Sequence, residues 1–342
     1  MSMLYMSKAE FDSVVGVNAT REDLSDTISL LTTRPRPISQ NIGQVKATNV
    51  LHKWDEQPRN SNALASVTYT EGGTPGTNAI ALNKISNKVC RQGLVAQVTD
   101  TMAAEWNGAG SWKLADGENA RMLQEAIDYQ VELVTMDVMD GVELMHLIGD
   151  QTNPGLLAGG ATDGLLTWVK ANGNVVATGG TTGTPVNFTE TFIKDGARAI
   201  AEQYATYMPD TILVPPELIP DINGFVANGA GRPVVINQAA GPNGTNDLLA
   251  GVQVGYYNTG FSVLKIRMEP YLSPLQNSAL VNPAVLIYSE KAVKQANLIP
   301  LGAEPLARTN TSVSKMVTIE YAQEHRVAKH TAVMSDVKSA IT

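Results

Sequence analysis

Cysteine is almost absent from this sequence, which has 342 residues and a single thiol, Cys90. One cysteine excludes an internal disulfide framework and any metal site built from several cysteines. Because free cysteines are among the most buried residues in proteins, we expect Cys90 to be a buried thiol. An intermolecular disulfide is the alternative.

Long apolar runs are absent as well. No stretch approaches the roughly 18 apolar residues that a membrane-spanning helix needs. Residues Met1–Lys8 lack the basic start, apolar stretch and small-residue cleavage site of a secretory signal. We therefore expect a soluble protein that is made in the cytoplasm and has no membrane partner.

Catalytic signatures are also missing. The sequence has no phosphate-binding loop, dinucleotide fingerprint or nucleophile elbow, and Gly108–Trp112 lacks the trailing glycine of either glycine motif. The four histidines include no pair at a metal-binding helical spacing. His325 and His330 lie on an expected strand at a spacing that predicts opposite faces. The sequence therefore predicts no enzyme, cofactor or metal.

An acidic triplet, Asp137, Asp140 and Glu143, is the nearest approach to a metal site, because carboxylates three residues apart share a helix face. Acidic helix faces are more often simply solvated. We favour a solvated face or a subunit contact over a cation site.

The composition itself is that of a globular protein, with 43% hydrophobic and 17% charged residues in a chain long enough for two domains or one elaborate domain. A net charge of −8 argues against nucleic-acid binding by the chain as a whole. Residues 30–92 carry eight basic and three acidic side chains, whereas residues 100–163 carry two basic and twelve acidic ones. This asymmetry suggests complementary surfaces.

The first hundred residues predict extended chain. Residues 1–45 hold one short helical signal before Arg34-Pro-Arg-Pro37, which predicts an N-terminal arm. Residues 46–57 and 65–70 alternate in polarity as strands do, and a third extended stretch covers residues 80–98. Few of these residues are bulky and apolar, so we predict a long β-hairpin that projects from the body.

A helix over Asp116–Ile148 is the clearest single element. At ~1.5 Å per residue it would be about 50 Å long. Gly141 costs about 1 kcal/mol inside a helix, which predicts a bend or close packing there. The apolar stripe, at spacings of three, four and seven residues, consists of Leu123, Ile127, Val134, Val138, Met145 and Ile148.

The second half, after a Gly-, Thr- and Asn-rich stretch over residues 149–187, predicts a sheet covered by helices. One helix opens at Thr189, with Phe192 and Ile200 on its apolar side, and another runs from Pro215 to Phe225. Strands are expected at residues 211–214, 252–257, 261–268 and 284–288, with one or two long strands at 315–333 and a hairpin turn at 258–260. The fold class is α+β.

The order of these elements resembles the capsid fold of Hong Kong 97-type tailed bacteriophages. His52-Lys-Trp54 resembles a histidine–acidic–tryptophan signature in a large subfamily of phage major capsid proteins, although Lys53 replaces the acidic residue. The resemblance covers nearly the whole chain. Its other segments, in chain order, are Glu71-Gly72, Asn83, Gln97–Thr99, Tyr256–Lys265, Leu298–Leu301, Glu304–Ala307, Ser314-Lys315 and Ile319–Tyr321.

This resemblance implies a Hong Kong 97-type capsid fold with an N-terminal arm (residues 1–45) and an extended β-hairpin loop (residues 46–98). It implies a peripheral domain (residues 99–150, with the long spine helix, and 305–342) and an axial domain (residues 151–304). The implied function is that of a major capsid protein, which self-assembles as pentamers and hexamers into the icosahedral shell around phage double-stranded DNA.

The partners implied are further copies of the chain and a portal. The sequence has no long charged helical extension, so a scaffold, if used, is a separate protein, and decoration proteins are further candidates. Packaged DNA is expected to make only non-specific contact. The resemblance places the protein in the virion capsid after synthesis and assembly in the host cytoplasm. Two rival classes are an encapsulin-type nanocompartment shell and an unrecognised soluble enzyme.

In the capsid fold the extended loop of one subunit lies across the spine helix of the next. We therefore expect basic loop residues to meet acidic residues on a neighbour's helix. The arm is expected to lie along an adjacent subunit without folding back onto its own core. The candidate contact residues are Arg34, Arg36, Lys53, Arg59, Lys84, Lys88, Arg91, Glu118, Glu125, Asp128 and Glu132.

Overall fold

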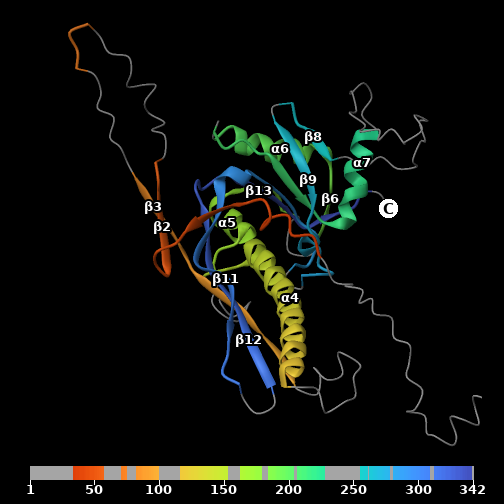
Figure 1. The fold of residues 1–342 in the computed structure, drawn as a ribbon. Coiled ribbons are helices and arrows are strands. Elements are labelled where there is room, and N and C mark those ends of the chain that lie inside the picture. The colour runs from red at the N-terminus through yellow and green to blue at the C-terminus, as the bar shows by residue number, and fades with distance from the viewer. Residues whose placement is uncertain are drawn as a thin grey trace, which may run out of the picture. The chain divides into compact units, whose positions relative to one another are not determined.

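The chain divides into two compact units, Met1–Thr33 and Arg34–Thr342, and all the elements below belong to the second unit (Figure 1). The computed structural model describes residues 34–57, 71–74, 82–99, 116–152, 162–178, 184–203, 206–227, 255–260, 262–277, 280–308 and 312–340. None of the described helices combines the length and hydropathy needed to cross a membrane.

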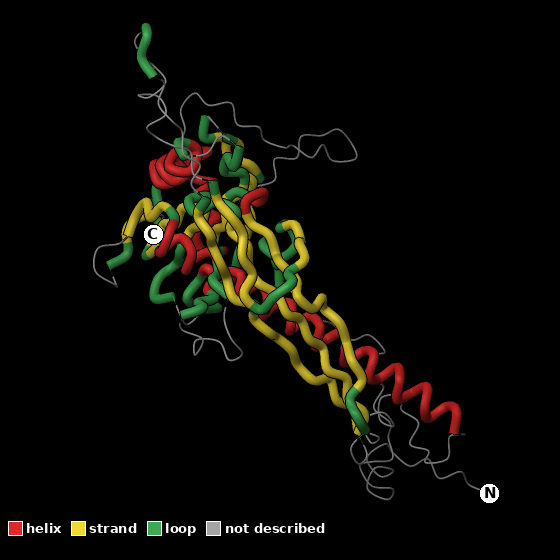
Figure 2. Tube along the Cα trace, turned by 90° about the vertical axis from the view of Figure 1, so that its left-hand side faces the viewer, coloured by secondary structure: helices red, strands yellow, loops and turns green. Residues whose placement is uncertain are grey.

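A four-stranded sheet carries the long helix. Its strand order is β1 (Gly43–Lys46), β11 (Val293–Pro305), β12 (Ser312–His325) and β4 (Cys90–Thr99), with β1 parallel to β11 and the other pairs antiparallel. Helix α4 (Asp116–Ile148) has the bounds that its apolar stripe predicted. It lies along β4 and β12, as Figures 1 and 2 show.

Two groups of buried side chains join α4 to this sheet. Toward the end of the helix, Val138 and Met145 pack against Val317 and Ile319, and nearer its start Ile127 packs with Val98. Cys90 is a buried free thiol, as predicted, and its burial raises the pKa to about 12.

A six-stranded sheet forms the second layer of the fold. Its order is β5 (Asn174–Thr178), β13 (Thr331–Ser335), β10 (Val285–Tyr288), β7 (Thr211–Val214), β9 (Val263–Met268) and β8 (Tyr256–Asn258). Because successive side chains of a strand point to opposite faces, its central strands fill two cores. One core lies against α5 (Leu165–Asn172) and the end of α4, and the other against α6 (Glu190–Ala201) and α7 (Ile219–Ala227).

Short elements complete the described chain. The 3-10 turns are η2 (Pro216–Leu218), η3 (Pro270–Leu272) and η4 (Glu290–Ala292). A parallel ladder joins β14 (Val337–Lys338) to β6 (Val186–Asn187), and an antiparallel ladder joins β2 (Leu51–Glu56) to β3 (Asn83–Lys88). The β2–β3 ladder is the base of the predicted hairpin, and the strand expected at residues 65–70 lies outside the described residues.

The sheet pairing differs from the expected domain boundaries at three segments. Strand β4, assigned to the extended loop, pairs with β12 in the four-stranded sheet. Strand β11, assigned to the axial domain, pairs with β12 as well. Strand β13, assigned to the peripheral domain, lies inside the six-stranded sheet. Chain segments that follow one another therefore change sheets at residues 89–90 and 326–330.

Gly141, which lies inside α4, does not pack closely against a neighbouring segment. A Cβ added at Gly141 would lie 3.4 Å from Gln92 Oε1, an ordinary contact. The tight glycines lie at the end of the helix. A Cβ at Gly149 would lie 2.2 Å from the Thr162 carbonyl oxygen, and one at Gly164 would lie 2.7 Å from the Met145 carbonyl oxygen. Two backbone segments therefore cross there with no room for a side chain.

Candidate functional site

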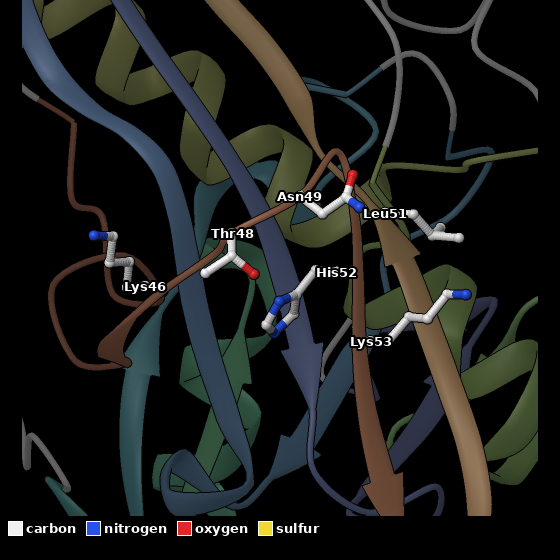
Figure 3. Close-up of a pocket in the computed structure, with 6 residues that line it drawn as sticks. All are labelled: Lys46, Thr48, Asn49, Leu51, His52 and Lys53. Atoms are coloured by element: carbon white, nitrogen blue, oxygen red, sulfur yellow. The ribbon is translucent and has the colours of Figure 1, made fainter.

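The described residues offer little that resembles a catalytic centre. A depression of about 290 Å³ is lined by six residues of one continuous segment, from Lys46 to Lys53. Figure 3 shows the side chains of Lys46 and Lys53 pointing away from each other, with His52 between them. No group of three metal-ligating side chains occurs among the described residues. The candidate functional surfaces are therefore the basic hairpin and the acidic helix, which the charge distribution of the sequence indicated.

The hairpin base has two chemically different faces. Register pairs Leu51 with Lys88, Lys53 with Ser86 and Asp55 with Lys84, which places three lysines and one aspartate on the same face. All three lysines are exposed. This surface, the lysine face, consists of Lys53, Lys84 and Lys88. It keeps the positive charge that the sequence predicted for the loop.

The opposite face of the hairpin base is attached to its own subunit. The Trp54 indole N–H donates to the His325 carbonyl oxygen at 2.8 Å, and His52 Nε2 lies 2.9 Å from a Glu324 carboxylate oxygen. The Ala328 N–H donates to Glu56 at 3.2 Å. These three inward-facing residues of β2 therefore contact the end of β12 and the turn that follows it. Their contacts leave the lysine face on the outer side of the hairpin base.

A stack of rings supports this attachment. The Trp54 and Trp168 ring centroids are 6.3 Å apart, and Trp168 stacks on His325 at 4.3 Å with nearly parallel planes. The Trp168 indole N–H donates to the Ala328 carbonyl oxygen at 3.0 Å. Aromatic contacts of this kind add specific geometry to apolar burial.

His325 and His330 are the most direct correction to the sequence analysis. They were predicted to point to opposite faces, but His325 Nδ1 lies 3.0 Å from His330 Nε2 and both rings are fully buried. The reason is that β12 ends at His325 and the chain turns before β13, so strand alternation does not apply between them. Burial lowers the pKa of His330 to about 3. Burial, and then the neighbouring His330, hold the pKa of His325 well below its usual value.

A buried amide also anchors the hairpin, and the sequence analysis did not find it. Asn87 of β3 donates to the Gln323 and Asp163 carbonyl oxygens at 2.8 and 3.2 Å, and its own oxygen accepts from the Asp163 N–H at 2.8 Å. A buried amide with matched partners is strongly positioned, because losing any partner would leave a desolvated polar group. Its alternation with two lysines in β3 is the signal that could have indicated an inward residue.

Two of the predicted contact residues on β4 and α4 already have partners within the subunit. Arg91 forms an ion pair with Glu320 across β4 and β12. Asp128 accepts a hydrogen bond from Lys315 Nζ at 2.6 Å, and this bond, with one from Gln124, holds the pKa of the Asp128 carboxyl below its usual value. Both pairs are partly exposed, so Arg91 and Asp128 can still contact a neighbouring subunit, but each charge is already partly compensated within its own subunit.

Of the remaining acidic candidates, Glu132 alone has a described side chain. Glu132 is exposed on α4. The side chains of Glu118 and Glu125 and the whole of Arg59 lie outside the described part of the structure.

The predicted arm folds back onto its own core where it is described, contrary to expectation. Arg36 Nε donates to Asp140 at 2.5 Å, and Arg34 donates to the Tyr271 hydroxyl at 3.2 Å. Ile38 is completely buried against the core of the six-stranded sheet. Residues 37–41 form turns instead of extended chain, with the Ile42 N–H donating to the Ile38 carbonyl oxygen at 3.1 Å, and residues 34–42 contact this subunit's own α4.

The acidic triplet on α4 is not a solvated face either. Only Asp137 is exposed. Asp140 pairs with Arg36, and the fully buried Glu143 accepts hydrogen bonds from the Ile38 and Ser39 N–H groups at 2.6 and 2.8 Å. Glu143 lies on the side of α4 opposite the apolar stripe, and its partners come from a distant segment, which periodicity alone does not reveal.

Comparisons with known proteins agree with this architecture. The model of the SU10 major capsid protein family matches residues 9–338. The chain is similar to one from the capsid of a native GTA particle, with a TM-score of 0.61, 10% identity, and 95% of this chain and 98% of that chain covered. It is similar to a Gordonia phage Cozz chain at a TM-score of 0.58, with 10% identity and 100% and 98% covered.

An encapsulin is a further structural relative. The SrpI encapsulin of Synechococcus elongatus gives a TM-score of 0.52 at 11% identity, with 98% of this chain and 97% of that chain covered. At such identities these likenesses show the fold alone. No curated protein matches the chain.

Proposed function

This chain belongs to the SU10 major capsid protein family, and from that premise we propose how its surfaces build a shell. It is a phage major capsid protein with the Hong Kong 97-type fold, and it assembles with further copies of itself. The observation that carries this conclusion is the extent of the family match, which includes the hairpin base, α4 and both sheets.

The finer proposal concerns the particle. Pentamers and hexamers of this chain form an icosahedral shell around double-stranded DNA, with a portal at one vertex. A scaffold, where one acts, is a separate protein, and decoration proteins bind the finished surface. DNA contact is non-specific, in keeping with the net charge of −8. Assembly takes place in the host cytoplasm, and the chain has no catalytic role of its own.

We divide the subunit along its sheets. The peripheral domain comprises α4 with the four-stranded sheet, and the axial domain comprises the six-stranded sheet with α5, α6 and α7. The extended loop runs from residue 47 to residue 89, between β1 and β4. This division follows the buried cores, which are what makes a domain compact.

The lysine face is the proposed contact with the next subunit. Lys53, Lys84 and Lys88 are exposed on one side of the hairpin base, while the other side is occupied by its own subunit. The proposed partners are Glu118, Glu125 and Glu132 of a neighbour's α4. Arg91 and Asp128 have lesser roles, because Glu320 and Lys315 already pair with them.

Each of these contacts is weak by itself. An exposed ion pair contributes about 0–1 kcal/mol. Repeated at every interface, such pairs set register and disfavour wrong contacts more than they add affinity. The screening length falls from about 10 Å at 0.1 M salt to about 3 Å at 1 M, so assembly yield should fall as salt rises.

Charge reversal tests the lysine face. The variant K84E/K88E should lower the yield of closed particles, and adding E125K/E132K in the same chain should partly restore it. The matched control, K291E/K338E, makes the same change in charge at two exposed lysines outside the hairpin and outside the turn that it contacts, and it should assemble normally. Equal yields for the two lysine pairs, or no rescue, would refute the role of this face.

Electron microscopy of the purified full-length protein tests the function itself. Closed particles of uniform size are expected, and a chain that remains monomeric under all assembly conditions would overturn the shell proposal. The alternative, an encapsulin-type compartment, shares the fold. It would be indicated by particles that retain a co-purifying cargo enzyme, with no portal and no DNA.

A further inference from the structure

Residues 34–42 cross α4 and are called the strap. Its hold on the subunit is mostly polar. Arg34 reaches Tyr271, Arg36 reaches Asp140 and the Met136 carbonyl oxygen, and the Ile38 and Ser39 N–H groups both donate to Glu143. Pro37, Ile38 and Ile42 add apolar burial. The strap therefore depends on the charge state of the groups beneath it.

Glu143 is the central acceptor in this arrangement. One carboxylate oxygen accepts the Ile38 N–H at 2.6 Å and the other accepts the Ser39 N–H at 2.8 Å. The side chain is completely buried. Both short bonds require an acceptor at each oxygen, which is the ionised form of the carboxyl.

A second buried carboxyl, Glu269, lies against Glu143. It precedes η3, is also completely buried, and lies close enough to the Glu143 carboxyl for the charge of Glu143 to raise the pKa of Glu269. Glu269 Oε1 accepts the Tyr271 N–H at 3.1 Å, whereas Oε2 has no N–H or O–H donor among the described residues. Two carboxylates cannot share a buried site while both are ionised, because their repulsion is poorly screened there.

One proton resolves both problems. Placed on Glu269 Oε2, it is donated to a Glu143 oxygen, which satisfies the orphaned atom and removes the repulsion. Burial, and then the negative charge of Glu143, raise the pKa of Glu269 to about 10. A carboxyl with a raised pKa favours the folded arrangement at lower pH, and this contribution is lost as the pH rises through about 10.

The other charged groups around the pair come from each neighbouring element. Arg34 and Arg36 belong to the strap, Asp140 and the buried His146 belong to α4, and Tyr271 belongs to η3. Tyr288 of β10 and Tyr321 of β12 also face Glu143. Burial raises the pKa values of these two tyrosines well above the usual value, so neither compensates a second negative charge.

We propose that Glu143 and Glu269 share one proton, and that this shared proton latches the strap onto α4 and the axial domain. Loss of the proton separates the two carboxylates and releases residues 34–42. The latch joins three parts of the chain that are distant in sequence, so it sets where the N-terminal residues leave the subunit.

Infrared spectroscopy of the full-length protein tests the proton directly, because a protonated carboxyl absorbs at a different frequency from a carboxylate. The wild type should show the protonated band at neutral pH and lose it on alkaline titration. The E269Q variant should lack it. The matched control, E290Q, removes a carboxyl that is ion-paired with Lys265 and Arg267 and should leave the band unchanged. Absence of a band that depends on Glu269 would overturn the proposal.

Hydrogen exchange of the Ile38 and Ser39 amides tests the latch. E269Q keeps a neutral donor toward Glu143, so protection should stay within about threefold of wild type. E143Q replaces one carboxylate oxygen with an NH₂ group, which cannot accept an N–H from the strap. Exchange of the Ile38 and Ser39 amides should therefore rise by about tenfold or more. After correction for intrinsic rates, wild-type protection should also fall on alkaline titration, and that of E269Q should not. Unchanged protection in E143Q, or the same alkaline loss in E269Q, would refute the latch.

Discussion

Acid sensitivity of the His325–His330 pair is the sharpest prediction for subunit stability. The two rings fit only as neutral tautomers. His325 Nε2 lies 3.2 Å from the Asp163 carbonyl oxygen and must donate to it, so His325 Nδ1 is the acceptor for His330 Nε2 at 3.0 Å. Protonation of His325 would set two N–H groups against each other in a buried site.

The sign and size follow from the lowered pKa values. The unfolded chain binds a proton at each histidine near pH 6.5, whereas folded His330 does so only near pH 3. Stability is therefore present above about pH 6.5 and is lost as the pH falls below it. Between about pH 7 and about pH 5 the lowered pKa of His330 costs about 2 kcal/mol, and the lowered pKa of His325 acts in the same direction.

Urea unfolding of unassembled subunits at a series of pH values is the appropriate assay, because assembled shells would add a dependence on concentration. The H330Q variant removes one titrating ring but keeps a donor for His325, so the acid loss should fall by about 2 kcal/mol between about pH 7 and about pH 5. Burial raises the pKa values of Asp163 and Glu269, so these carboxyls stabilise the folded subunit as the pH falls and partly offset the loss from the histidines. The informative quantity is therefore the difference in acid slope between wild type and variant.

The V285A variant provides the control, because it removes buried methyl groups and no titrating group. It should lower the stability by a similar amount at every pH and keep the acid slope of wild type. An H330Q variant with the full wild-type slope would refute the assignment of acid sensitivity to the buried pair.

Three further predictions concern the packing and hydrogen bonding of the subunit. I38A should cost about 2–5 kcal/mol in urea unfolding, because Ile38 is fully buried, whereas I299A at an exposed position should stay within about 0.5 kcal/mol. G164A should unfold at markedly lower urea, since its Cβ would meet backbone atoms at 2.7 Å, whereas G141A should stabilise α4 by up to about 1 kcal/mol. W54F should cost about 1–3 kcal/mol and increase proteolysis of the hairpin, because the His325 carbonyl oxygen loses its indole donor.

Elements with a regular period were predictable from the sequence. The α4 stripe predicted both ends of the helix, and the run Thr211–Val214 predicted a strand that is buried on both faces. The turn before Phe261 was predicted from its composition, and Gly260 adopts the positive φ of +97° that favours glycine. Local chemistry decides such elements, so a single sequence suffices to find them.

Elements that depend on distant partners were missed. Helix α5 is short and begins at Gly164 without a side-chain cap, so no sequence signal marks its start. Strand β11 contains Pro300 and Pro305, which normally argue against a strand. It tolerates them because β1 pairs only with Lys294–Asn297, and the rest of that edge needs no N–H donors toward β1.

The candidate contact residues divide for the same reason. Charge counting identified a positive loop and a negative helix, but it could not assign partners. Four of them have partners in their own subunit, namely Arg34, Arg36, Arg91 and Asp128, whereas Lys53, Lys84 and Lys88 lie on an exposed face. The difference lies in strand register, since alternate residues of β2 and β3 face the body and the intervening ones face away.

The strap, the hairpin base and β3 are all attached to the body of the subunit by polar joints, meaning hydrogen bonds and ion pairs, although apolar contacts would also exclude water. The strap rests on Glu143, the hairpin base on Glu324 and the His325 carbonyl oxygen, and β3 on the Asn87 amide. Apolar packing tolerates small rotations, but a buried hydrogen bond loses its partner when the geometry shifts. A shell subunit must present its loop and arm in directions that its neighbours can use. Polar joints define those directions, and a change of one charge at a joint should therefore disturb assembly more than removal of a methyl group nearby.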